Sequence, residues 1–333
     1  MNKNYNSLSR RKTPWDDLKD ISPLQFYIRD EYREHYYLHH DKDYGEARLL
    51  NQFKPHSCPY CESTKFKKYG FNKQEIQKYK CSVCNRTFII TTGTIFQDHK
   101  LSIREWIEYL LNLFDYSSIN LDSKTNKNAL STSKYWLAKV FLLLKDYQKN
   151  IVLKEEVQID ETYYSLINKE IVKKNNKKLR GLSKNKYCIG IACDIENVYC
   201  VVEGIGKTSS KKTTDAFLKH IKPGSYLTHD DEKAHNALIE TLNLKSISYN
   251  SKYLKQLSDK DNPLRKINHY CFLLKKFLNT HSSFKRDELN DYLNLFAFIM
   301  NRPSDRLEKV DLLLEKSLNC HKIVTFRDYY IKK

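Results

Sequence analysis

The sequence predicts a multidomain α/β protein in which a mixed-sheet domain follows a cysteine-rich segment and a helical region. Three observations carry this prediction. Short runs rich in β-branched and aromatic residues begin near residue 155 and later alternate with helical segments. Two Cys-x-x-Cys pairs lie within residues 56–92, and residues 101–149 have a helical pattern. At roughly 100–200 residues per domain, the 333-residue chain should form two or three domains.

The mixed sheet is predicted from the order of the elements after residue 155. Three strands come first, joined by a hairpin turn at Asn197 between the second and third, and helices then alternate with two further strands. Such an order indicates a sheet with both parallel and antiparallel pairs. The expected strands are VQIDETYY, YCIGIACDIE, VYCVVEGI, SYLTHD and KSISYNS, and the expected helices are KTTDAFLKHI, AHNALIETL and a long helix from about Pro263 to Thr280.

A polar segment of residues 169–186 separates the first two expected strands and carries eight Lys or Arg. We expect a mobile basic loop there. It could clamp DNA, or it could be a disordered insertion.

The helical region should contain two long helices. In LSIREWIEYLLNLF, Ser102 is the expected N-cap, and Glu105 would complete a capping box. STSKYWLAKVFLLLKDY should begin after a cap near Ser131 or Ser133. INLDSKTNKNA between them is expected to be a polar loop, and aromatic and aliphatic residues from Pro23 to about Leu50 predict one or two further helices.

The two cysteine pairs predict a structural zinc site. Cys58 and Cys61 form the first pair, Cys81 and Cys84 form the second, and 19 residues separate the pairs. Two such knuckles complete a tetrahedron of four thiolates, which leaves no open position for catalysis. The other five cysteines lack ligand spacing, and most lie in apolar runs typical of small core residues. They are Cys188, Cys193, Cys200, Cys271 and Cys320.

The charge balance favours a polyanionic partner. Lys and Arg total 58 against 40 Asp and Glu, a formal charge of +18, which makes nucleic acid the first candidate and a merely solubilising surface the alternative. No apolar run approaches the roughly 20 residues that span a bilayer, and the N-terminus lacks the apolar middle of a signal peptide. We therefore expect a cytoplasmic, nucleoid-associated protein without a membrane partner, whose cysteines stay reduced.

Two aspartates are candidate metal ligands. Asp160 lies within an apolar strand and Asp230 ends another, where the two carboxylates could converge on one pocket and bind Mg²⁺. A pair of such ions would promote phosphodiester chemistry. Glu161 and Asp231 adjoin these residues, and only one of each pair should face the pocket. A lone Asp at a strand end can also be a turn or cap residue.

The long helix offers a third group of site residues. Asn268 and Lys275 are seven positions apart and so share a face, where Asn268 could supply an oxygen to a metal and Lys275 could contact a phosphate. An ordinary polar face of an amphipathic helix would look the same.

Several stretches together resemble the ISXO-like insertion-sequence transposases that carry an N-terminal zinc ribbon. The likeness runs from about Cys58 to Pro303. It rests on the order and spacing of CPYC…YKCSVCNRTF, TTGTIF, QIDETYY, THDDEKAHNAL, KINHYCFLLKKFL and YLNLFAFIMNRP.

The resemblance implies an RNase H-like catalytic core and Mg²⁺-dependent DDE-type transposition. Matched residue by residue, Asp160 is the first acid and Asp230 the second, while Asn268 and Lys275 fit a variant with Asn in the third position. The family pattern has Gly where this chain has Asp231, which leaves open whether Asp231 takes the place of Asp230.

We therefore expect five parts. They are an N-terminal helical region (1–55), a zinc ribbon (56–95), a helix-turn-helix-like DNA-binding region (96–152), an RNase H-like core (153–303) and a C-terminal tail (304–333). The ribbon and helices would bind double-stranded DNA at the terminal repeats, and Asn128, Ser131, Thr132, Ser133 and Lys134 would enter the major groove. Joining two ends to target DNA requires a homo-oligomer. An inactive DNA-binding relic and another RNase H-fold nuclease remain alternatives.

Overall fold

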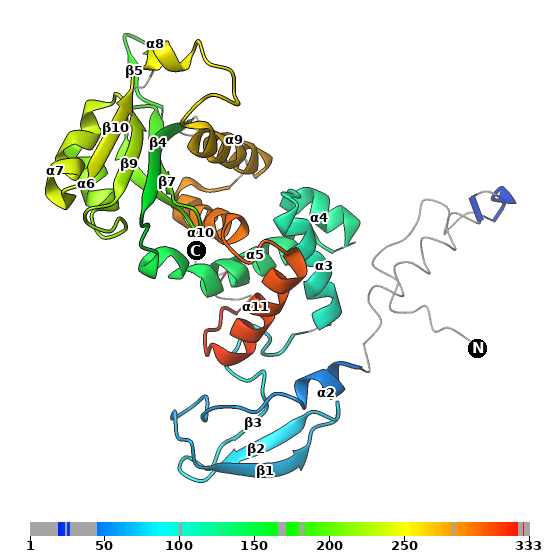
Figure 1. Cartoon of the computed structure of the whole chain (residues 1–333). Coiled ribbons are helices and arrows are strands. Elements are labelled where there is room, and N and C mark those ends of the chain that lie inside the picture. Colours follow the sequence, from blue (N-terminus) through cyan, green and yellow to red (C-terminus); the bar gives the residue numbers. More distant parts are fainter. Residues whose placement is uncertain are drawn as a thin grey trace. The chain divides into compact units, whose positions relative to one another are not determined.

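A computed structural model describes residues 19–23, 25–26, 45–99, 102–126, 128–165, 171–179, 181, 184–281, 284–325 and 329. The chain divides into two compact units. The N-terminal unit comprises Met1–Lys134 with Leu314–Ile323, and the C-terminal unit comprises Tyr135–Leu313 with Val324–Lys333. Each is considered separately, and Figure 1 labels their elements.

The cysteine-rich segment forms a three-stranded antiparallel sheet. Strands β1 (Phe66–Phe71), β2 (Gln77–Cys81) and β3 (Thr87–Phe88) lie in that order. One face packs as a small aromatic core, because Phe66 meets Tyr79 and Phe88 edge-on at centroid distances of 5.6 and 5.5 Å. Helix α2 (Gly45–Leu50) precedes the sheet. It lies at the end of the predicted helical segment 23–50, most of whose remainder falls outside the described residues.

Helix α3 (Ile103–Phe114) begins as predicted. Ser102 accepts from the backbone N–H of Glu105, and the Glu105 carboxylate accepts from the N–H of Ser102, which completes the capping box. The buried side chains recur at helical spacing, and Trp106 packs edge-on against Phe96 at 5.6 Å. The capping box therefore fixes the start of a helix whose apolar face is fully buried.

The expected polar loop after α3 is wrong, because residues Ile119–Thr125 form helix α4. Ser118 caps the helix by accepting from the N–H of Leu121 at 3.1 Å. The buried Asp122 carboxylate then accepts from the side-chain amide of Asn126 at 2.6 Å. Polar side chains hold this helix, so apolar periodicity does not reveal it.

Helix α5 (Leu130–Leu144) starts earlier than predicted. The N–H groups of Thr132 and Ser133 donate to the carbonyl of Ala129, so the first turn of the helix has already formed there. Ser131 and Ser133 therefore lie inside the helix and are not its N-cap. The Ser133 side chain is fully buried, and its carbonyl accepts from the hydroxyl of Tyr109. This correction places Ser133 in the packed first turn of the helix.

The C-terminal unit contains the mixed sheet that the sequence predicts. Its strand order is β10-β9-β4-β7-β8, and it fits the expected RNase H-like α/β core. The bounds are Glu156–Ser165 for β4, Lys186–Cys193 for β7, Val198–Ile205 for β8, Tyr226–Asp230 for β9 and Lys245–Tyr249 for β10. Strand β4 pairs antiparallel with β7 and parallel with β9, so it occupies the centre. Asn197 lies in the β7–β8 turn as expected, where its N–H donates to Asp194.

Helices cover both faces of this sheet (Figure 1). Helices α6 (Ser210–Phe217) and α7 (Asn236–Leu242) pack on one face, over an apolar core that includes Val157, Ile159 and Leu227. Helices α9 (Arg265–Thr280) and α10 (Leu289–Met300) pack on the other. Successive residues of β4 therefore face two different helical layers.

The basic segment 169–186 contains a hairpin, where a loop was predicted. Strands β5 (Lys173–Lys174) and β6 (Lys177–Lys178) pair antiparallel around Asn175 and Asn176. Both turn residues have positive φ, 51° and 59°, which Asn tolerates better than most side chains. Asn185 closes the base by two hydrogen bonds with the backbone of Val172.

Strand β8 is an edge strand whose outward backbone groups are satisfied by side chains. The amide of Gln148 accepts from the N–H of Cys200 at 2.7 Å and donates to its carbonyl at 3.0 Å. The amide of Asn301 forms the equivalent pair with Val198, at 2.6 and 3.1 Å. Two buried side-chain amides thus bond to β8 as a neighbouring strand would.

The remaining elements are short helices and one long one. They are α8 (Ser251–Leu254), α11 (Arg306–Asn319) and the 3-10 turns Tyr147–Asn150, Lys233–His235 and Arg286–Glu288. The segment expected as a C-terminal tail thus contains helix α11. Among the described residues, no helix is both long and apolar enough to cross a membrane.

The amide contacts of β8 predict a specific loss of stability. Replacing Gln148 by Glu or Asn301 by Asp removes the donor and leaves a buried backbone carbonyl unsatisfied. Each change should lower the free energy of unfolding of the C-terminal unit by about 1–3 kcal/mol, measured by urea denaturation. The exposed Gln256→Glu change is the control. Equal stability in all three variants would show that these amides do not stabilise the edge.

Candidate functional site

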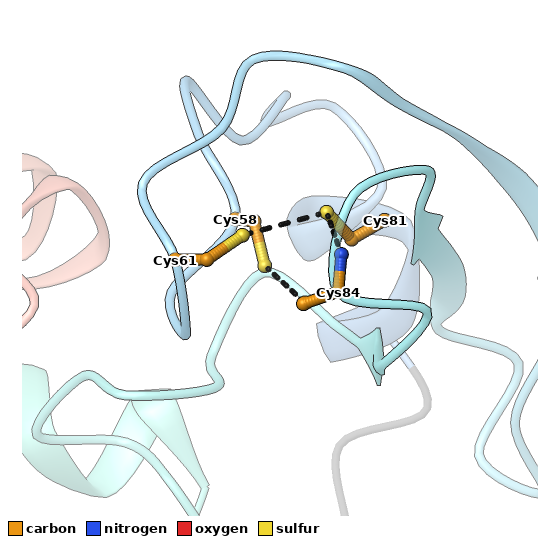
Figure 2. Close-up of side chains that lie close together, drawn as sticks. All are labelled: Cys58, Cys61, Cys81 and Cys84. Atoms are coloured by element: carbon orange, nitrogen blue, oxygen red, sulfur yellow. Dashed lines mark hydrogen bonds between the residues drawn. The ribbon is translucent and has the colours of Figure 1, made fainter.

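The four predicted zinc ligands lie together in the N-terminal unit. Figure 2 shows Cys58 and Cys61 facing Cys81 and Cys84. The sulfurs of Cys58 and Cys84 are 3.7 Å apart, and those of Cys61 and Cys81 are 3.6 Å apart. All four sulfurs lie within 4.8 Å of one another. The cluster could therefore hold a single metal ion.

The cluster has the dimensions of a four-thiolate site. A tetrahedron with metal–sulfur bonds of about 2.3 Å has edges of about 3.8 Å, close to the observed sulfur separations. The backbone N–H groups of Cys84 and Val83 point at the Cys81 sulfur and lower the pKa of that thiol to about 6. A thiolate is the form that binds metal.

Asp160 and Asp230 lie where the central strands separate. The parallel pairing of β4 with β9 ends at Gln158 and Thr228, although both strands continue. Extending this register by two residues sets Asp160 opposite Asp230, on strands roughly 4.8 Å apart before they separate. The structure therefore brings together the two aspartates that the sequence singles out.

Asp160 faces the α9 layer and is mostly buried. Its Oδ1 accepts from the N–H of Glu161 at 2.8 Å, and Oδ2 accepts from the thiol of Cys271 on α9 at 3.6 Å. Burial raises the pKa of Asp160 to about 6, and the charges of Glu161 and Asp230 add to the rise. This environment disfavours an isolated carboxylate, and a bound cation would offset that cost.

Asp230 has an unsatisfied oxygen, whereas Asp231 is exposed. Burial also raises the pKa of Asp230. Within the described part of the chain, no donor lies within hydrogen-bonding distance of its buried Oδ1 atom. Of the two neighbours, Asp230 is therefore the one whose surroundings fit a metal ligand.

Helix α9 places the other two predicted residues on the face that meets Asp160. Asn268 precedes Cys271 by three positions and Lys275 follows it by four, so all three share one face. The Cys271–Asp160 contact sets that face against β4. Asn268 and Lys275 are both exposed, with side chains open to an incoming ligand.

A buried polar chain lies behind the aspartates, on the α6–α7 side of the sheet. His235 Nε2 is 2.9 Å from a carboxylate oxygen of Glu161, and His235 Nδ1 is 3.0 Å from Nδ1 of His229. Burial acts to lower the pKa of His235, but the hydrogen bond and charge of Glu161 outweigh burial and raise it. Burial lowers the pKa of His229 to about 4. The polar side chains thus link β4 to β9 beyond their last backbone pair.

Two features of this site were not predicted from the sequence. Cys271 was expected to be a small core residue, and His229 and His235 were given no role. Alternation along β4 did imply that Glu161 faces away from Asp160, and the structure confirms this. The contacts of Glu161 with His235 and of His235 with His229 could not be predicted, because they depend on where the Lys233–His235 turn lies in the fold.

Comparisons with known proteins find similarity in the segment that forms the mixed sheet and its helices. Residues 152–301 match the model described as ISXO2-like transposase domain. A protein of the transposable element ISH50 from Halobacterium salinarum, itself uncharacterized, is 29% identical over 143 residues, 41% of this chain and 47% of that protein. The match therefore spans about half of that relative's length.

Two solved structures give weaker likenesses. The mariner Mos1 paired end complex with Mg is 14% identical, with a TM-score of 0.30, over 65% of this chain and 76% of that one. A simian T-cell lymphotropic virus intasome is 11% identical, with a TM-score of 0.30, over 46% and 50%. Over residues 152–301, slightly less than half of the chain, this protein is thus similar to the ISXO2-like transposase domain.

Proposed function

We propose that this protein is a DNA transposase of an insertion sequence, which cleaves the ends of its element and joins them to target DNA. The observation that carries the proposal is the position of Asp160 and Asp230 within the transposase domain. They lie where β4 and β9 separate, beneath the face of α9 that bears Asn268 and Lys275. Ligands of open α/β sheets bind outside the carboxyl ends of such strands.

The residues of this site suit phosphodiester chemistry with Mg²⁺. Asp160 and Asp230 would hold the ions through hard carboxylate oxygens, and Asn268 would add a neutral oxygen. Two bound Mg²⁺ ions would polarise the phosphate and lower the pKa of a water molecule. Water would attack the phosphorus and displace the 3′ oxygen of the element end, leaving a 5′ phosphate on the flanking DNA. The freed 3′-hydroxyl would then attack a target phosphorus and displace the 3′ oxygen of the target strand. Lys275 would position the DNA by its charge.

The ribbon sheet supports DNA binding by the N-terminal unit. On its outer face, Lys67 pairs with Lys80 across β1 and β2, and the Lys78 and Lys80 ammonium groups lie 5.7 and 5.4 Å from the centre of the Tyr69 ring. Tyr69 is 49% exposed. The opposite face holds the aromatic core, so this basic and aromatic face is available to phosphates of double-stranded DNA.

Helices α4 and α5 offer a second DNA-binding element. They follow one another closely, as in a helix-turn-helix, and α5 would lead with its N-terminus. Of the five residues expected to enter the groove, Asn128 and Ser133 are buried, while Ser131 and Lys134 are exposed. We therefore propose that Ser131 and Lys134, with the half-buried Thr132, contact DNA.

The four cysteines would hold one structural Zn²⁺. Their sulfur separations fit a closed tetrahedron, and no further ligand position is needed. The ion would fix the ribbon sheet on which the basic face is built. Two chains acting on the two element ends would form the expected homo-oligomer on DNA.

The first prediction concerns the acidic pair. With a DNA fragment carrying the gene's own flanking repeats, the wild type should nick and join strands only with Mg²⁺. Asp160→Asn and Asp230→Asn should each lower the rate by at least about 10³-fold, because the site loses a charged metal ligand. Asp231→Asn should keep most activity, which also settles the choice between these neighbours. A wild type that binds the ends but never cuts would indicate an inactive relic.

The second prediction separates the roles of Asn268 and Lys275. Asn268→Ala should raise the Mg²⁺ concentration for half-maximal cleavage several-fold, and Asn268→Asp should lower it, because a charged oxygen binds the ion more tightly. Lys275→Met should instead weaken binding of DNA and leave the Mg²⁺ requirement unchanged. Lys276→Met, on the adjacent exposed position, is the control. An unchanged Mg²⁺ dependence in both Asn268 variants would remove Asn268 from the site.

The third prediction concerns zinc. Purified protein should contain about one zinc per chain by elemental analysis, and Cys81→Ser should lose it together with binding of the terminal repeats. Cys320→Ser, outside the cluster, should keep both. A Cys81→Ser variant that binds DNA with wild-type affinity would separate the metal site from DNA recognition.

A further inference from the structure

We infer that Glu161, His235 and His229 form a positioning bridge that holds Asp160 and Asp230 together across the gap between β4 and β9. This inference rests on the proposed function, because it assigns these three residues to the support of the proposed metal ligands.

Backbone hydrogen bonds do not hold the two aspartates at a fixed separation. The β4–β9 pairing ends at Gln158 and Thr228, two residues before each aspartate. Beyond that point β4 stays paired with β7 as far as Ser165, and β9 stays paired with β10 as far as Asp230. The sheet is thus split between its two central strands at the level of the site, and each half would be free to shift.

The bridge spans this split from the covered side. Glu161 follows Asp160 on β4, His229 precedes Asp230 on β9, and His235 lies between them with contacts of 2.9 and 3.0 Å. The side chains of His235 and Glu161 are 0% and 5% exposed. Alternation along the two strands directs Glu161 and His229 to the sheet face opposite their neighbouring aspartates, although the ligand atoms of His229, His235 and Asp230 lie within 4.8 Å of one another.

Acidic side chains and a glycine surround His235 and Glu161. Asp230, Glu203 and Glu161 all act on His235 as negative charges. Glu203 is held by the hydroxyl of Thr208 at 2.5 Å. A Cβ at Gly190, which pairs with Glu161 on β7, would lie 2.6 Å from a Glu203 oxygen, so only glycine leaves room for that carboxylate. Polar groups this deep are costly unless they bond to one another. His235 bonds to Glu161 and Thr208 bonds to Glu203, whereas one oxygen each of Glu203 and Asp230 has no hydrogen-bond partner among the described residues.

The test measures binding of Mn²⁺ alone to the full-length, zinc-loaded protein. Binding is detected by the electron paramagnetic resonance signal of Mn²⁺. His235→Phe and Glu161→Gln should each weaken Mn²⁺ binding by about tenfold, as for other groups that orient metal ligands. The Asp160→Asn/Asp230→Asn double variant gives the background. Glu161→Gln keeps the size of the side chain, so it covers the case in which His235→Phe does not fold.

A second readout comes from the zinc-loaded protein without added Mn²⁺. Hydrogen–deuterium exchange should accelerate at residues 159–161 and 229–231 in both variants, because the two strand ends are no longer tied. Gln148→Glu is the matched control, since it disturbs a buried hydrogen-bonding side chain of the same unit remote from the split. It should lose stability yet keep Mn²⁺ affinity and local exchange.

The outcomes separate this inference from the proposed function. Wild-type Mn²⁺ affinity in His235→Phe and Glu161→Gln, or effects equal to those of Gln148→Glu, would overturn the bridge even if the protein is an active transposase. Weakened Mn²⁺ binding with faster exchange at the two strand ends would support it, even in a chain that never cleaves DNA.

Discussion

The candidate site depends on the point at which parallel pairing between β4 and β9 ends. Up to Gln158 and Thr228 the backbone fixes the register, and this register alone decides that Asp160 and Asp230 stand side by side. Past that point the two strands are no longer paired, and the proposed ions and phosphate would bind beside the two carboxylates. A register shift of one residue would exchange the faces of Asp160 and Glu161 and move the acidic pair apart.

The two proposed metal sites differ in what the protein must supply. The four sulfurs in the ribbon already stand at the separations of a closed tetrahedron, so an ion there would stabilise structure without needing substrate. The aspartates are instead buried beside one another, and each has a raised pKa through burial. In the proposed site, a divalent cation would offset the cost of burying these two carboxylates. The thiol of Cys271 lowers part of that cost for Asp160.

Patterns of residues predicted most of the fold and the clustering of the four cysteines. Strands with alternating or continuous apolar runs lie where expected, and the cysteine spacing led directly to the cluster. Helix α4 was missed because Ser118 and Asp122 stabilise it by polar contacts that leave no apolar period. The bridge through His235 was missed because it joins three elements, and no spacing along the chain reports their distances. Whether Asn268 acts on a metal stays a prediction.

The side-chain amides along β8 have a consequence for how the molecule behaves in a crowded solution. An exposed strand edge is a template on which another chain can add a strand, the first step toward insoluble assemblies. Gln148 and Asn301 already occupy the backbone groups of Cys200 and Val198 that such a strand would use. Addition of a strand is therefore hindered at the Val198–Cys200 end of β8, and β10 forms the other edge of the sheet.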